Sequence, residues 1–216
     1  MSTPSVEDYV KAIYKAETLG EVTSQDIAKR VGVSAPAVSK MLRKLQELHF
    51  AKVHPKTGIH LSESGKKTAL RIIRRHRLLE LYLVKELGYG WDEVHDEAEK
   101  LEHHISPLFE ERIAARLGHP EFDPHGDPIP TAEGEIRIID EQLLSALENP
   151  LRLEITRILD RDPELLRYVA ELELLPGTKI EFLGRERFGG SFRIKIGAKE
   201  LALAPEAAAQ IFARVA

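Results

Sequence analysis

Apolar residues recur at intervals of three and four along the first third of the chain, which is the spacing of one face of a helix. The first stripe predicts a helix over 6–18 and consists of Val6, Tyr9, Val10, Ile13 and Tyr14. Thr23 and Ser34 are typical N-cap residues for two more short helices, which Gly32 separates at a tight turn. This helix-turn-helix pattern turns four residues of its second helix inward, namely Val38, Leu42, Leu45 and Leu48.

Two short strands follow these helices. Residues 50–53 and 59–62 flank a loop that contains Pro55 and Gly58, which is the pattern of a β-hairpin. Three helices followed by a hairpin predict a winged helix-turn-helix domain over residues 1–65. Winged helices also serve as protein-contact modules, but basic outward residues favour DNA binding.

The next part of the chain, residues 66–130, is predicted to be helical. Apolar residues at helical spacing indicate helices over 65–87, 91–104 and 107–117. Helices this apolar need a partner, and the first is long enough to cross a dimer interface, so we expect a homodimer. Four prolines and three glycines between residues 118 and 134 predict a linker or an ordered loop.

The hydrophobic pattern changes its period in the C-terminal part. Alternating apolar and polar residues predict strands over 153–158, 179–183, 192–196 and 201–203. An amphipathic helix is expected over 163–173. Several short strands with glycine turns predict a small β-barrel over residues 151–216, preceded by a linker over 131–150. The fold class is therefore mainly α with small β parts.

Composition excludes several classes of protein. The chain has 216 residues and no cysteine, which rules out a disulfide scaffold, a thiolate nucleophile and a cysteine-based zinc or iron–sulfur site. Its longest stretch without a charged residue spans only residues 31–39, whereas a membrane-spanning helix needs about 20 apolar residues. Glu7, Asp8 and Lys11 would interrupt the apolar core of a signal peptide. We therefore expect a cytoplasmic protein with no membrane partner.

Charge divides the chain at residue 75. Residues 1–75 carry a net charge of +7 and residues 76–216 a net charge of −11, which together give the overall −4. Such asymmetry is typical of a chain with one end that faces nucleic acid. Uneven scatter of surface charge would produce the same split, so the split alone does not decide between the two explanations.

Histidines and carboxylates gather between residues 76 and 104. His76 and Glu80 stand four residues apart on one predicted helix. The next predicted helix carries along one face His95, Glu99, Glu102 and His103. One such pair is ordinary on a protein surface, but six residues on consecutive helices predict a divalent-metal site.

The ligand types narrow the choice of metal. Without cysteine, and with Met1 and Met41 far from the cluster in sequence, the ligands are oxygen and nitrogen atoms. Such ligands suit Mn²⁺ or Fe²⁺ and give copper(I) no soft donor. Zn²⁺, Co²⁺ and Cd²⁺ also fit the ligand set chemically, so we expect them to be able to substitute.

These motifs resemble the diphtheria toxin repressor (DtxR) family of metal-dependent transcription regulators. The most specific is Val94-His-Asp-Glu-Ala-Glu-Lys-Leu-Glu-His-His104, and further resemblance lies at 3–14, 34–40, 75–80 and 126–130. The manganese transport regulator branch (MntR) is nearest at the N-terminus, and residues 164–177 resemble an SH3-like (FeoA-like) domain. The resemblance implies a winged helix-turn-helix, a helical metal-binding and dimerisation domain, and an SH3-like barrel.

The resemblance also implies ligands for two metal sites. The residues that match the primary, activating site are Asp8, Glu99, Glu102 and His103. Those that match the ancillary site are His76, Glu80 and His95, to which the C-terminal domain would add Asp162 or Glu164. Lys11 stands where the manganese branch has a glutamate. Because a lysine cation cannot ligate a metal and repels a second one, we expect two separated mononuclear sites.

DNA contacts are expected from the second helix of the helix-turn-helix and from the hairpin. The residues expected at base edges are Ser34, Pro36, Ala37, Ser39 and Lys40. Those expected on phosphates are Arg43, Lys44, Lys52 and Lys56. A two-fold dimer would set its recognition helices one turn of B-DNA apart, on a palindromic operator. Family resemblance implies repression of metal-uptake genes by the metal-loaded protein, which would be no enzyme and need no organic cofactor.

Two other functions stay open at this point. A helical di-metal carboxylate enzyme would need paired Glu-x-x-His motifs or a His-Glu-x-x-His motif, and the sequence has neither. A winged-helix regulator that senses an organic ligand would leave the carboxylates as ordinary surface residues.

Overall fold

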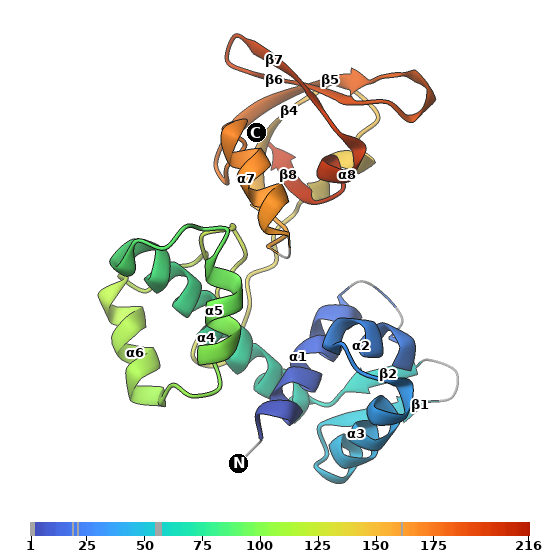
Figure 1. The fold of residues 1–216 in the computed structure, drawn as a ribbon, viewed down its shortest axis with the longest axis vertical. Helices are drawn as coiled ribbons and strands as arrows, with labels where there is room; N and C mark the ends of the chain where they lie inside the picture. The colour runs from blue at the N-terminus through green and yellow to red at the C-terminus, as the bar shows by residue number, and fades with distance from the viewer. Residues whose placement is uncertain (1–2, 19, 21, 55–57, 161) are drawn as a thin grey trace. The chain divides into compact units, whose positions relative to one another are not determined.

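The computed structural model describes residues 3–18, 20, 22–54, 58–160 and 162–216 (Figure 1). The chain divides into two compact units, each with a hydrophobic core of its own. The first unit comprises Met1–His76, Leu101–Ser106 and Pro130–Ile136. The second unit comprises Arg77–Lys100, Pro107–Ile129 and Arg137–Ala216.

The N-terminal part of the first unit consists of α1 (Pro4–Glu17), α2 (Ser24–Val31), α3 (Ala35–Glu47), β1 (Ala51–His54) and β2 (Gly58–Leu61). The predicted helix-turn-helix and hairpin are therefore confirmed. The hydroxyl of Thr23 accepts a hydrogen bond from the N–H of Asp26 at 3.2 Å, and the Asp26 carboxylate accepts one from the N–H of Thr23 at 3.0 Å. This reciprocal cap starts α2. Gly32 ends the helix at φ 71°, a conformation that glycine adopts without strain.

The second helix of the helix-turn-helix, α3, differs from the prediction in two details. Ser34 precedes the helix, but its side chain makes no capping hydrogen bond. The inward residues Val38, Leu42 and Leu45 are buried, whereas the expectation for Leu48 is wrong. Leu48 follows the last residue of α3 and is 43% exposed, because the chain leaves the helix there. After it, β1 pairs antiparallel with β2 in one hairpin. Pro55 of the predicted loop lies outside the described residues.

Three helices follow the hairpin, namely α4 (Glu63–Leu87), α5 (Val94–Leu101) and α6 (Pro107–Arg116). The helix predicted over 91–104 is too long at both ends, because residues 91–93 form turns and α5 stops at Leu101. There the N–H of His104 donates to the carbonyl of Leu101, three residues back, which tightens the chain out of the α-helix. Glu102 and His103 consequently lie in a turn and not on a helix face.

The proline- and glycine-rich segment before residue 130 is an ordered loop. A carboxylate oxygen of Asp123 accepts hydrogen bonds from the N–H groups of His125 at 2.8 Å and Asp127 at 3.0 Å. Gly126 has φ 90°, and a Cβ atom there would lie 2.0 Å from the carbonyl oxygen of Thr156. Only glycine allows this close approach of the loop to β4 (Leu151–Ile158).

The C-terminal part forms one antiparallel sheet with the strand order β3-β8-β4-β5-β6-β7. Besides β4 its strands are β3 (Gln142–Leu143), β5 (Lys179–Arg185), β6 (Phe192–Ile196), β7 (Lys199–Leu203) and β8 (Ile211–Val215). The predicted strands and the helix α7 (Pro163–Glu171) are confirmed. Two strands and a one-turn helix were not predicted, namely β3, β8 and α8 (Pro205–Ala208). Of these, β3 and α8 are only two and four residues long. Leu144–Ala146 and Arg187–Gly189 form 3₁₀ turns.

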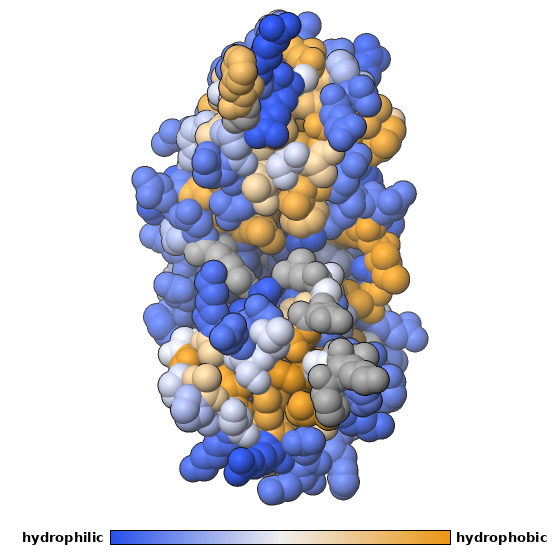
Figure 2. Space-filling model, turned by 90° about the vertical axis from the view of Figure 1, so that its right-hand side faces the viewer, coloured by the Kyte–Doolittle hydropathy of each residue, from blue (hydrophilic) through white to orange (hydrophobic). Residues whose placement is uncertain are grey.

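Apolar residues from the sheet and from α7 fill the core of this part, with Leu153, Phe182 and Phe192 almost wholly buried. Figure 2 shows polar side chains over most of the face that it draws, with apolar side chains grouped in patches between them. Among the described residues, no helix is both long enough and apolar enough to cross a membrane.

Candidate metal centres

The first unit brings a carboxylate from α1 to a histidine from the turn after α5. Nε2 of His103 lies 2.8 Å from a carboxylate oxygen of Asp8, and Nδ1 of the same ring lies 2.8 Å from Glu7. Glu102 stands beside them, with Oε1 3.5 Å from Nε2 of His103. The ligand atoms of Asp8, Glu102 and His103 all lie within 4.8 Å of one another. This geometry suits a single small cation.

The electrostatics of His103 favour a positive charge at this point. The hydrogen bond to Asp8 raises the pKa of His103, burial lowers it, and Glu7 and Glu102 raise it further, to about 9. The imidazole therefore carries a proton at neutral pH when no metal is bound. A metal that binds this ring takes the place of that proton.

Glu102 has a second cation beside it. Nζ of Lys11, on α1, donates to both carboxylate oxygens of Glu102, at 2.9 Å and 2.8 Å. Nδ1 of His76, on α4, lies 2.6 Å from Oε2 of the same carboxylate. The side chains of Lys11, His76 and Glu102 are all buried. His76, predicted as an ancillary ligand, thus contacts a residue predicted for the primary site.

Glu99, the fourth residue of the predicted primary set, lies on α5 in the second unit. Its side chain is 39% exposed, and a carboxylate oxygen lies 3.9 Å from Nε2 of His95. Glu99 therefore stays a predicted ligand.

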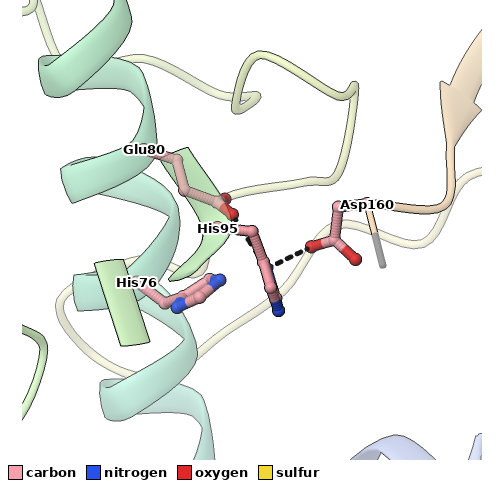
Figure 3. Close-up of side chains that lie close together, drawn as sticks. All are labelled: His76, Glu80, His95 and Asp160. Atoms are coloured by element: carbon pink, nitrogen blue, oxygen red, sulfur yellow. Dashed lines mark hydrogen bonds and ion pairs between the residues drawn. The ribbon is translucent and has the colours of Figure 1, made fainter. Parts of the chain in front are cut away.

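The second unit brings His95 on α5 to two carboxylates (Figure 3). Nδ1 of His95 lies 3.3 Å from Glu80 on α4 and 3.1 Å from Asp160, which follows β4. His76 lies one helical turn before Glu80 on α4 (Figure 3). Burial by itself would lower the pKa of His95, but hydrogen bonds to Asp160 and Glu80 outweigh it and raise the pKa to about 10.

The C-terminal contribution to this cluster is Asp160 and not one of the two residues that the sequence analysis named. Asp162 is the N-cap of α7, where its carboxylate accepts from the N–H groups of Glu164 at 3.0 Å and Leu165 at 3.2 Å. Glu164 is exposed in the first turn of that helix. An Asp directly before a Pro at the start of a helix is an N-cap signal, and Asp162-Pro163 carries it. With Asp162 assigned to the cap, Asp160 is the nearby carboxylate that is left to meet His95.

A third group of ligand-type residues shares Glu80. Glu80, Asp123 and His125 are buried, and their ligand atoms lie within 4.8 Å of one another. Nε2 of His125 lies 2.7 Å from the carbonyl oxygen of Trp91, which can only accept, so Nε2 donates this hydrogen bond. Nδ1 is buried without a hydrogen-bond partner among the described residues and lies 3.9 Å from Oε2 of Glu80.

Asp123 adds a second carboxyl group to this cluster, beside that of Glu80. Burial raises the pKa of Asp123, and the nearby carboxylates of Asp127 and Glu80 raise it further, against the opposite effect of Arg77. Asp123 and His125 were not predicted as ligands, because they lie in a loop, where no helical spacing marks them. A bound divalent cation would offset the charge of these carboxylates and satisfy Nδ1 of His125.

The described residues among those predicted to contact DNA lie on or just before α3 and on β1. On or just before α3 the exposed residues are Ser34, Pro36, Ala37, Ser39, Lys40, Arg43 and Lys44. Lys52 is exposed on β1, and Lys56 lies outside the described residues. Exposed lysine and arginine next to small side chains on one helix provide a surface that can approach a DNA groove.

Comparison with known proteins gives three family matches that together span most of the chain. The description "Iron dependent repressor, N-terminal DNA binding domain" matches residues 1–59. "Iron dependent repressor, metal binding and dimerisation domain" matches residues 62–131, and "FeoA domain" matches residues 142–215.

Individual relatives agree with these matches. The iron-dependent repressor IdeR of Mycobacterium tuberculosis is 35% identical over 127 residues, which are 58% of this chain and 55% of that protein. The chain thus matches about half the length of this mycobacterial relative. The regulator MntR of Bacillus subtilis is 36% identical over 107 residues, 49% of this chain and 75% of that protein. A solved manganese-dependent transcriptional repressor in complex with manganese is 39% identical, with a TM-score of 0.92 over 98% of this chain and 100% of that chain.

Proposed function

Because the chain belongs to the diphtheria toxin repressor family of metal-dependent transcriptional repressors, we propose that it is a DNA-binding repressor activated by Mn²⁺ or Fe²⁺. Its targets in this proposal are metal-uptake genes, which it represses when metal-loaded. The family consists of transcriptional repressors and not of enzymes, so the di-metal enzyme considered from the sequence is set aside.

One observation supports this function most strongly. Asp8 belongs to the first helix of the DNA-binding part, and it meets Glu102 and His103, which follow α5. When bound there, a divalent cation would supply positive charge that offsets the carboxylates and joins α1 to the turn after α5. The position of α1 then depends on metal, and the helix-turn-helix that packs on α1 follows it.

The proposed primary ligands are Asp8, Glu99, Glu102 and His103. Three carboxylates and one imidazole are hard donors that suit Mn²⁺ or Fe²⁺, and the chain has no cysteine to favour a softer metal. Co²⁺, Cd²⁺ and Zn²⁺ fit the same donors chemically. Lys11, beside Glu102, supports one metal ion at this site and not a pair bridged by Glu102. With two metal ions, the Glu102 carboxylate would have to be shared by both ions and by the ammonium group of Lys11.

A second cation is proposed around Glu80. Its two carboxylate oxygens face different partners, with Oε1 toward His95 and Oε2 toward His125. Asp160, in place of Asp162 or Glu164, supports the His95 side, where His76 was also predicted. The unpartnered Nδ1 of His125 supports the other side. The two positions share Glu80, so we propose one ion there and not two.

The DNA-facing surface in this proposal is α3 with β1. Arg43, Lys44 and Lys52 would contact phosphates, and the N-terminal end of α3 would contact base edges. Pro36 and Ala37 offer only apolar contact, so direct base readout should be modest and DNA shape important.

We propose a homodimer on a palindromic operator in the cytoplasm. Large apolar side chains stay exposed near the end of α4 and on α6, namely Leu87, Tyr89, Leu108 and Phe109. A second copy of the chain that covers such side chains would remove them from water.

A mobility-shift assay on the DNA upstream of the chain's own gene and of metal-transporter genes tests the function. Binding should require Mn²⁺ or, without oxygen, Fe²⁺, and should disappear with a chelator. Equal binding with chelator would favour the regulator of an organic ligand instead.

A further inference from the structure

Lys11 is a buried cation inside the proposed primary site. It lies on α1, one turn after Asp8, and its side chain is 5% exposed. Both oxygens of Glu102 accept hydrogen bonds from its ammonium group, at 2.9 Å and 2.8 Å. Glu102 itself is 0% exposed. This is a bidentate, desolvated ion pair and not an ordinary surface contact.

The contacts of Glu102 leave little room for a metal. A carboxylate has about four lone-pair positions, two on each oxygen. Oε2 uses both of its positions, on Lys11 and on Nδ1 of His76 at 2.6 Å. Oε1 accepts from Lys11 and faces His103 at 3.5 Å. A metal held by His103 would therefore have Oε1 as the nearer Glu102 oxygen, which is also a hydrogen-bond acceptor of Lys11.

Two cations on one carboxylate repel each other strongly, because little water screens them in a buried site. The metal can fill the site only if the ammonium group of Lys11 moves away from Oε1 or if the two charges tolerate close approach. Either way, part of the attraction between Glu102 and the metal is lost to Lys11.

We propose that Lys11 is a built-in competitor of the metal: it holds Glu102 while the primary site is empty and sets the metal concentration at which the site fills. The inference rests on the proposed function. It adds a residue that binds no metal and no DNA but determines how much metal is needed.

The test replaces Lys11 with methionine, which keeps the length of the chain and removes the charge. Isothermal titration calorimetry of the Lys11→Met variant with Mn²⁺ should give a dissociation constant for this site at least about tenfold lower than that of the unmodified protein. The metal-free variant should melt roughly 10 °C lower, because Glu102 stays buried without its cation. Mn²⁺ should restore most of that loss.

Lys15→Met is the matched control. Lys15 lies one turn further along α1, and among the described residues no carboxylate forms an ion pair with it, so both readouts should stay unchanged. Lys11→Gln, which keeps an N–H group for Glu102, should show the tighter metal binding with a smaller loss of melting temperature. It also serves if the methionine variant does not fold.

The outcomes separate the inference from the function beneath it. If Lys11→Met or Lys11→Gln binds Mn²⁺ no more tightly than the unmodified protein, or more weakly, Lys11 merely orients Glu102 and the inference is wrong. If His103→Ala leaves the Mn²⁺ titration of the unmodified protein unchanged, the primary site itself is wrong. In the double variant Lys11→Met, His103→Ala, the tighter binding should be lost.

Discussion

Nε2 of His103 lies 2.8 Å from a carboxylate oxygen of Asp8, so a side chain from the turn after α5 meets one from the first helix. His103 also has a further charged neighbour, since its Nδ1 lies 2.8 Å from Glu7. In the absence of metal a proton on His103 holds this connection. A metal would bind through a nitrogen of the same ring, so a proton and a metal compete for His103.

This competition predicts a pH dependence of metal affinity. The pKa of His103 is about 9 in the metal-free chain, and a metal needs the neutral ring. As the pH rises towards 9, Mn²⁺ affinity should therefore increase about tenfold for each pH unit, and above pH 9 it should level off. Titrations at several pH values between 6.5 and 9 check this, in buffers that do not bind metal. An affinity independent of pH over that range would contradict a metal on His103.

Asp160 and Asp162 form a matched pair for the second metal position. Asp160→Asn should weaken metal binding at that position, because Asp160 contacts His95. Asp162→Asn should leave the metal stoichiometry unchanged. Since asparagine is nearly as good an N-cap as aspartate, its effect on stability should be small, whereas Asp162→Ala should lower the free energy of unfolding by about 1 kcal/mol.

The readouts for this pair are metal counting after dialysis and thermal unfolding. If Asp162→Asn lost the second metal and Asp160→Asn kept it, the ligand suggested by sequence would be right and Asp160 would have only a structural role.

Arg43 and Lys44 are predicted to contact phosphates. Replacing either with alanine should weaken binding to specific and to random DNA alike, and should make the slope of log affinity against log salt concentration smaller by about 1. Fluorescence anisotropy at several salt concentrations measures both effects. Lys199→Ala, on β7, is the control and should change neither. A change in sequence preference after Arg43→Ala would place that side chain at a base edge instead.

The helices and strands could be predicted largely from the sequence because their signals are local. Each signal determines the conformation of only a few residues. Examples are the cap at Thr23, the glycine at residue 32 and the alternation of apolar and polar residues within 192–196. The end of α5 could not be predicted, because the motif from Val94 to His104 keeps helical spacing through the turn that follows Leu101.

The chemical types of the metal ligands could be predicted from the sequence, but not all the residues that lie beside them in the folded chain. Asp160 and His125 come from a strand end and a loop, and only the folded chain brings them to Glu80 and its neighbours. The ion pair between Lys11 and Glu102 is likewise a contact over long sequence separation. Helical periodicity carries no information about such contacts.

Metal bound at His103 should activate DNA binding. Fluorescence anisotropy on the operator found by the mobility-shift assay measures this directly, with Mn²⁺ and with chelator, for the unmodified protein and for His103→Ala and His104→Ala. His104 is the adjacent, exposed histidine and serves as the matched control. The unmodified protein and His104→Ala should bind the operator about 100-fold more tightly with Mn²⁺ than with chelator, whereas His103→Ala should lose most of this difference. Equal operator affinity of the unmodified protein with Mn²⁺ and with chelator would contradict the claim.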